Sequence, residues 1–260
     1  MENLIFEFIK KNKTEQLINA TSKDLECTNV EGLTPLNYAV SLNDLDSIKL
    51  LLKKGSDINA LDDVGLCALE YSILNANTEI FYFLLSHEAN VNINREGFTL
   101  VHAAAISGNE MILKELIKKG LKPKINSKDE GGRTPLLWAA QEGNKSIAAK
   151  LIELGADIDS SDNEGFTALE IATSENSVDF VKMLIESGVD VNKTTVDGGR
   201  AIHAACAWGN MEVLELLINA GAIVNIQDNE GMTPLHFACE HCFSEIAELL
   251  LLKRAEFNYK

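Results

Sequence analysis

A glycine that returns about every 33 residues is the feature of this chain that most constrains its fold. The seven glycines are Gly32, Gly65, Gly97, Gly132, Gly165, Gly198 and Gly231. Their spacings are 33, 32, 35, 33, 33 and 33 residues. A fixed period of this length is typical of a repeat architecture, in which each unit is one supersecondary structure that buries its apolar face against its neighbours.

Each unit contains the signals of two helices joined by a turn. A four-residue segment such as TPLN at 34–37 or TPLH at 233–236 follows the glycine and one variable residue. Thr before Pro favours a helix start, because Thr caps the first turn and Pro fits its first position. A block such as IAAKLIELGADID at 147–159 follows, with apolar residues at helical spacing and Gly155 where the helix should end. Small residues such as Ala139 would let neighbouring units approach closely.

The pattern resembles the ankyrin repeat family. The matching features are the period, TPLHFAC at 233–239, LLINAGAIVN at 216–225 and DNEG at 228–231. The resemblance implies an all-α ankyrin-repeat solenoid of stacked helix-turn-helix units with β-hairpin-like loops, forming one continuous domain. We expect a degenerate N-terminal capping repeat at 1–28 and ankyrin repeats at 29–61, 62–93, 94–128, 129–161, 162–194, 195–227 and 228–260.

Two departures from the repeat pattern carry expectations of their own. The loop at 120–132 is two residues longer than usual and contains Pro123, so we expect a local change of curvature near 121–131. The last unit has an apolar second helix, IAELLLL, with no polar unit to cover it. Solenoids need polar terminal repeats for solubility. The final helix is therefore exposed, or it binds something, or the native chain continues past residue 260, which is the alternative we favour.

Composition excludes several classes of partner. The net charge of −16 disfavours nucleic acid and anionic membrane surfaces, since an acidic surface repels phosphate. The N-terminal apolar stretch is too short and too interrupted for a signal peptide, and no apolar run approaches the roughly 18 residues of a membrane helix. Five dispersed cysteines favour free thiols in a reducing compartment. We expect a monomer in the cytoplasm, with the nucleus as the alternative, and no membrane insertion.

The motifs that suggest chemistry have structural interpretations. Cys239-x-x-Cys242 lacks the second ligand pair of a structural zinc site and the βαβ context of a redox motif, so we interpret both as buried or half-buried thiols, with Cys239 a small core residue. His102, His203 and His236 occupy one repeat position, where the resemblance implies a bond to the neighbouring unit. Since no catalytic signature is found, we expect no enzyme activity, no cofactor and no metal site.

Candidate binding residues follow from the resemblance. In the ankyrin family, hairpin tips and first helices line a concave groove, so the residue after the repeat glycine and the ninth and tenth residues after it are expected to face partners. The candidates on these positions are Phe98, Arg133, Gln141, Glu142, Phe166, Glu175, Trp208, Met232, Glu240 and His241. Trp is the residue type most enriched at binding hot spots. The alternative for Trp208 is that it leans on a neighbouring helix, and we interpret Trp138 as structural.

These observations favour a non-catalytic scaffold or adaptor for protein–protein interaction. An apolar centre with an acidic rim suits a partner segment that is basic and carries apolar anchors. The alternative is a regulatory or targeting ankyrin domain of a larger enzyme, channel or effector protein.

Overall fold

A computed structural model of the protein describes residues 4–255, and almost all of their regular structure is helical. One short helix opens each repeat. These first helices are α1 (Leu4–Lys10), α3 (Pro35–Ser41), α5 (Ala68–Leu74), α7 (Leu100–Ser107), α9 (Pro135–Gln141), α11 (Ala168–Ser174), α13 (Ala201–Ala207) and α15 (Pro234–Glu240). The second helices are α4 (Leu45–Lys53), α6 (Thr78–Ser86), α8 (Glu110–Leu116), α10 (Lys145–Glu153), α12 (Val178–Glu186), α14 (Met211–Asn219) and α16 (Ser244–Leu252). This alternation confirms the predicted all-α solenoid.

The first helices begin where the sequence signals predict. The Thr34 and Thr134 hydroxyls accept the N–H groups of the residues three positions later, at 3.1 and 3.4 Å, and proline holds the first helical position. In α11 the cap is reciprocal, because the Thr167 N–H donates to the Glu170 carboxylate at 3.0 Å. These contacts satisfy amide groups that have no partner inside the helix.

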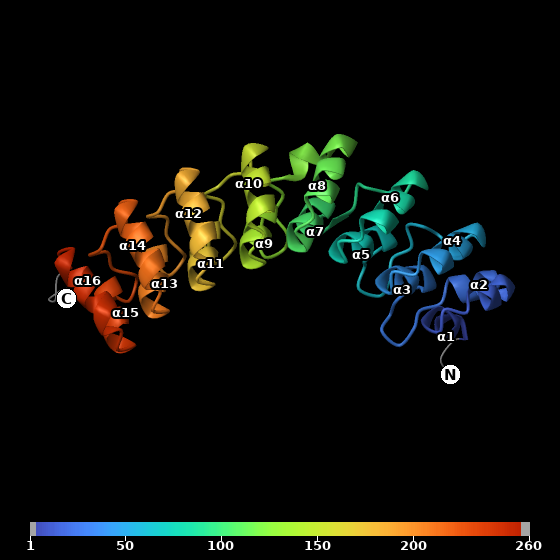
Figure 1. Ribbon diagram of the computed structural model, residues 1–260, viewed down its shortest axis with the longest axis horizontal. Helices are drawn as coiled ribbons and strands as arrows, with labels where there is room; N and C mark the ends of the chain where they lie inside the picture. The colour runs from blue at the N-terminus through green and yellow to red at the C-terminus, as the bar shows by residue number, and fades with distance from the viewer. Residues whose placement is uncertain (1–3, 256–260) are drawn as a thin grey trace. The chain divides into compact units, whose positions relative to one another are not determined.

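Small side chains let the first helices stack tightly. The alanines at the predicted packing position, Ala39, Ala104, Ala139, Ala172, Ala205 and Ala238, are all completely buried. Within residues 123–260, neighbouring first helices approach each other more closely than neighbouring second helices do. The side formed by α9, α11, α13 and α15 is therefore the shorter, concave side of this unit, and Figure 1 shows these helices as a separate row.

Turns between repeats are stacked through main-chain hydrogen bonds. The Val196 N–H donates to the Glu164 carbonyl at 2.9 Å, and the Asn229 N–H donates to the Asp197 carbonyl at 2.9 Å. Gly165 adopts φ +87°, and a Cβ there would lie 2.7 Å from the Thr195 Cα. The repeat glycine therefore provides both a left-handed conformation and a close approach between turns. Residues 94–99 form a small hairpin of β1 (Asn94–Arg95) and β2 (Phe98–Thr99).

The chain divides into two compact units, Met1–Lys122 and Pro123–Lys260. The division falls in the longer loop, where a π-helical turn, η2 (Ile117–Leu121), and a short 3₁₀ turn, η3 (Lys122–Lys124), follow α8. The first unit opens with α1, a 3₁₀ turn, η1 (Thr14–Asn19), in place of a second helix, and α2 (Ser22–Leu25). The predicted repeat boundaries and the predicted change of curvature stay predictions.

Candidate functional site

Four equivalent positions recur at the ends of the first helices of the second unit, which form its concave side. Glu142, Glu175, Trp208 and His241 each end a first helix, as the C-caps of α9, α11, α13 and α15. The residue after each of them has a positive φ, which turns the chain sharply toward the second helix. Because the backbone repeats, the side chains in this row are presented at corresponding points of successive repeats. We call these four residues the C-cap row.

Trp208 is the most prominent apolar residue of the row. Its side chain is 65% exposed, and it follows the half-buried Ala207. Phe166, on the hairpin that leads into α11, is 38% exposed. The alternative, that the Trp208 ring leans on a neighbouring helix, stays a prediction, since most of the side chain is in contact with solvent. An exposed indole presents a large apolar area to solvent, and tryptophans of this kind dominate the energetics of many interfaces.

Carboxylates occupy neighbouring positions on the same set of helices and hairpins. Glu142, Glu175 and Glu240 are exposed at the ends of the first helices, and the hairpin tips carry further exposed acidic residues, Glu164, Asp197 and Glu230. The Glu175 carboxylate also bonds to the preceding repeat, since Gln141 Nε2 donates to its Oε1 at 3.0 Å. The concentration of negative charge would attract a basic partner and repel an acidic one.

Two predicted binding residues make contacts within the chain. Arg133 lies over the Trp138 ring at 5.0 Å from its centroid and places Nε 3.8 Å from Asp162 Oδ2. Phe98 lies in the first unit, where its ring stacks on His102 at 5.1 Å and lies beneath the Arg95 guanidinium. Met232 is half-buried, whereas Glu240 and His241 are exposed. The assignment of all ten residues to a partner stays a prediction.

The structural interpretation of Trp138 agrees with its contacts. Its indole Nε1–H donates to Asp129 Oδ2 at 2.8 Å. Of the three histidines at the repeated position, His203 links two repeats, because its Nε2 lies 3.1 Å from the Ile226 carbonyl oxygen. Burial lowers the pKa of His203, so the ring is neutral near pH 7. His102 and His236 each accept the N–H of the N-cap threonine of their own helix at Nδ1, at 3.0 and 2.9 Å.

The interpretation of Cys239 as a core residue is wrong. Cys206 is completely buried at the equivalent position, but Cys239 and Cys242 are both exposed, because within the described residues no repeat follows α15 and α16 to cover them. Cys242 has φ +59°, as it takes the place of a glycine such as Gly209. Among residues 4–255, no cluster of His, Cys, Asp and Glu side chains is arranged to hold a metal ion.

A buried carboxyl group lies in the first turn of α11. Glu170 of α11 is 3% exposed, and its Oε2 accepts from the Thr167 N–H and hydroxyl at 3.0 and 3.2 Å. Its Oε1 is buried with no hydrogen-bond partner among the described residues. Burial is the main cause that raises the pKa of Glu170 to about 7. Glu70 holds the same repeat position, but there the Arg95 guanidinium lies 3.5 Å from its Oε1.

Comparison with known proteins identifies the repeat. A family model for ankyrin repeats matches residues 55–129, 101–195 and 190–260, and a single-repeat model matches residues 31–63. The chain belongs to the ankyrin repeat family. Ankyrin repeats are generally protein-interaction modules without catalytic activity of their own.

Proteins similar to this ankyrin repeat chain differ widely in size. A 143-residue segment is 29% identical to "Ankyrin repeat protein nuc-2" of Neurospora crassa, covering 55% of this chain and 13% of that protein. A 128-residue segment is 33% identical to the human "Transient receptor potential cation channel subfamily A member 1", covering 48% of this chain and 11% of the channel. A fowlpox virus ankyrin repeat protein is 31% identical over 121 residues, which are 46% of this chain and 84% of the viral protein.

The matched segments thus span less than a quarter of the length of the Neurospora protein and of the human channel. The relatives include channel and signalling proteins, in which the matched ankyrin repeats are one portion of a longer chain. In the described part of this protein, each helix is too short or too polar to span a bilayer.

Sequence reasoning missed one feature of the ankyrin stack. Asparagine or aspartate recurs near the end of each repeat, at Asn59, Asn92, Asn126, Asp159, Asn192 and Asn225. Most of these side chains hydrogen-bond to the next repeat. The period of about 33 residues was the signal that could have revealed them.

Proposed function

We propose that this ankyrin repeat protein is a non-catalytic scaffold or adaptor that binds a basic partner segment with apolar anchors on the concave side of its second unit. The observation that carries the proposal is Trp208, whose side chain is 65% exposed in a row otherwise occupied by Glu142, Glu175 and His241.

The chemistry of the row supports this choice of partner. Removing the Trp208 indole from water would contribute apolar stabilisation, and a lysine or arginine beside it would gain both a cation–π contact and a neighbouring carboxylate. An acidic segment would meet uncompensated repulsion from the same carboxylates. Among the predicted residues, Trp208, Phe166 and the acidic C-caps are therefore the strongest candidates, whereas Arg133 and Phe98 have partners within the chain.

A second candidate is a regulatory or targeting domain within a longer protein. The relatives that support it are the much longer proteins, in which the matched segment covers 11–22% of the length. The two candidates share the same binding surface and differ in what the surface serves. We further propose that the protein acts in the cytoplasm or nucleus, as its free cysteines suit a reducing compartment.

Selection from a random peptide display library tests the partner class. Two selections are run in parallel, one on the parent protein and one on the Trp208→Ala, Phe166→Ala double variant, whose helix content is checked by circular dichroism. The proposal predicts that the parent enriches peptides with Lys or Arg beside large apolar residues and that the double variant does not. Enrichment of the same peptides by both proteins, or of acidic peptides by the parent, would contradict it.

A further inference from the structure

A side-chain carboxamide bridges successive repeats in the second unit. Asn126 Oδ1 accepts the Asp157 N–H at 2.9 Å, and its Nδ2 donates to the Gly155 carbonyl at 3.2 Å. Asn192 makes the same pair of bonds to the next repeat, which involve the Ile223 N–H at 3.0 Å and the Gly221 carbonyl at 3.1 Å. The two partners therefore lie 31 and 29 residues after the asparagine.

The first such bridge in the chain is not made. The equivalent position is Glu26, and its expected partners are the Asp57 N–H and the Gly55 carbonyl. Neither of these backbone groups has a hydrogen-bond partner within residues 4–255. Between them, the Ser56 hydroxyl is also buried without a partner in that part of the chain. The equivalent of Ser56 in other repeats is apolar, as at Ala89, so this hydroxyl is an additional departure.

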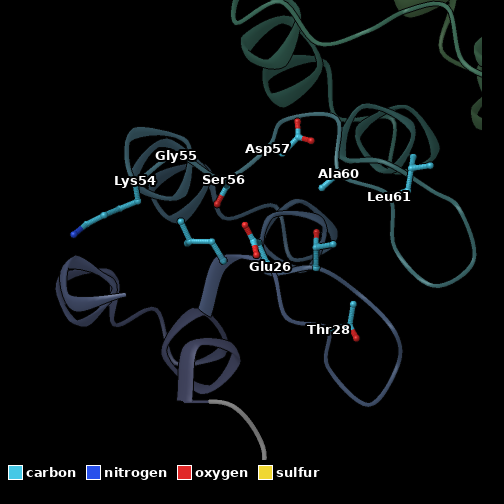
Figure 2. Close-up of a pocket in the computed structure, with 10 residues that line it drawn as sticks. Glu26, Thr28, Lys54, Gly55, Ser56, Asp57, Ala60 and Leu61 are labelled. Carbon is cyan, nitrogen blue, oxygen red and sulfur yellow. The ribbon is translucent and has the colours of Figure 1, made fainter. Parts of the chain in front are cut away.

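A cavity of about 380 Å³ lies at this position. Its lining includes Glu26, Thr28, Thr34, Gly55, Ser56 and Asp57. Figure 2 shows the Glu26 carboxylate and the Ser56 hydroxyl pointing toward one another, while Lys54 extends away; the Lys54 amino group donates to the Ile18 carbonyl. The volume is within the lower range of small-ligand sites and is several times the space that one water occupies.

We propose that this cavity binds a primary carboxamide, which takes the place of the missing asparagine side chain. The carbonyl of the ligand accepts the Asp57 N–H, and its NH₂ group donates to the Gly55 carbonyl and to the Glu26 carboxylate. Asn126 and Asn192 show, within the same protein, that a carboxamide makes the first two of these contacts.

Other ligand classes fit the cavity less well. A carboxylate would accept the Asp57 N–H but could not donate to the Gly55 carbonyl, and the Glu26 and Asp57 carboxylates would repel it. An ammonium group could donate to the carbonyl but could not accept from the N–H. A primary carboxamide is the common group that provides one acceptor and two donors in a plane. Such a group is found on small free amides and on Asn or Gln side chains of polypeptides.

The test is a titration of the ¹⁵N-labelled full chain with three probes: the peptide Gly-Asn-Gly, the matched peptide Gly-Asp-Gly, and acetamide. The readout is the backbone amide signal of Asp57. Gly-Asn-Gly is expected to shift it saturably, and Gly-Asp-Gly to bind at least about tenfold more weakly. Acetamide binding as tightly as Gly-Asn-Gly would identify a free small amide, and weaker acetamide binding would identify a polypeptide side chain; both support the proposal. Absence of a saturable shift with Gly-Asn-Gly, or equal binding of Gly-Asp-Gly, would overturn it.

Two variants make the test specific to the cavity. Glu26→Asn supplies the missing bridge from the chain itself, so it should abolish the response of Asp57 to the probes and raise the melting temperature. Glu26→Ala removes the carboxylate without filling the site, so the response of Asp57 should remain, with weaker binding. Probe binding to Glu26→Asn that equals binding to the parent would show that the carboxamide site is wrongly placed.

Discussion

Replacing Glu170 by Gln is expected to stabilise the second unit at pH 8 and to change its stability little at pH 5. The Glu170 carboxyl is buried, and one of its oxygens has no partner in the described residues. When the group ionises in the folded chain, its charge is held away from water, with Asp162 adding repulsion and Arg200 only partly offsetting it. Gln has nearly the same shape and cannot ionise, so it removes this cost at high pH.

The magnitude follows from the pKa of Glu170, which burial raises from 4.5 to about 7. Between these two values the folded chain holds one more proton than the unfolded chain, so stability falls as pH rises, by about 1.4 kcal/mol per pH unit. The contribution is fully present below pH 4.5 and is lost as the pH passes through about 7. The full loss is roughly 3 kcal/mol, a large share of the stability of a typical domain.

Urea unfolding at pH 5, 6, 7 and 8 measures the effect. Both tryptophans, Trp138 and Trp208, lie in residues 123–260, so their fluorescence follows the unit that contains Glu170. The difference in unfolding free energy between Glu170→Gln and the parent should increase with pH, and Glu164→Gln, at an exposed position of the same unit, should show no such increase. Taking differences cancels groups common to both proteins, such as His203. A difference that is the same at pH 5 and pH 8 would refute the reasoning.

Three further predictions concern packing between repeats. A thiol reagent should label Cys242 in the native protein but Cys206 only after unfolding, because Cys206 is buried and burial raises its pKa to about 12. Peptide mass spectrometry measures the labelling, and equal rates for the two cysteines would contradict the described burial. Gly165→Ala should lower the unfolding free energy by more than the roughly 1–3 kcal/mol of a left-handed residue alone, because its Cβ would also clash with Thr195. Gly155→Ala is the control, since its added Cβ has nothing within 4 Å, and its loss should be smaller. Equal losses in urea unfolding would count against the close approach. Asn192→Ala should cost about 0.5–1.5 kcal/mol, the net contribution of a typical hydrogen bond, because water replaces the partner of the exposed Ile223 N–H. No loss in the same assay would argue against the bridge.

Much of the fold could be predicted because the sequence repeats its local signals. The threonine cap and proline fix where α3, α9 and α15 begin, and alanine at one position fixes how closely neighbouring first helices approach. These effects act within one turn or between adjacent units, so a single unit contains the information for all of them. The same locality explains why the π-helical turn at Ile117–Leu121 could not be predicted, since it leads into the loop that departs from the repeat.

Less of the candidate site could be predicted, because exposure depends on what covers a residue. Cys206 and Cys239 have the same position in their repeats, yet only the first is buried by a following repeat. Arg133 was predicted as a binding residue, and the sequence did not show its contacts with the Trp138 ring and the Asp162 carboxylate. The Trp208 side chain is 65% exposed. The composition of the surface could thus be read from the sequence, but the pairing of its side chains could not.

The most direct test of the proposed function is the affinity of one selected basic peptide for three forms of the protein. Trp208→Ala removes the exposed indole of the C-cap row, and Ile223→Ala removes an apolar side chain that is 49% exposed in the loop after α14. Isothermal titration calorimetry should show a loss of about tenfold or more in affinity for Trp208→Ala and no measurable loss for Ile223→Ala. Equal affinities for the parent and Trp208→Ala would contradict the assignment of the concave side as the binding surface.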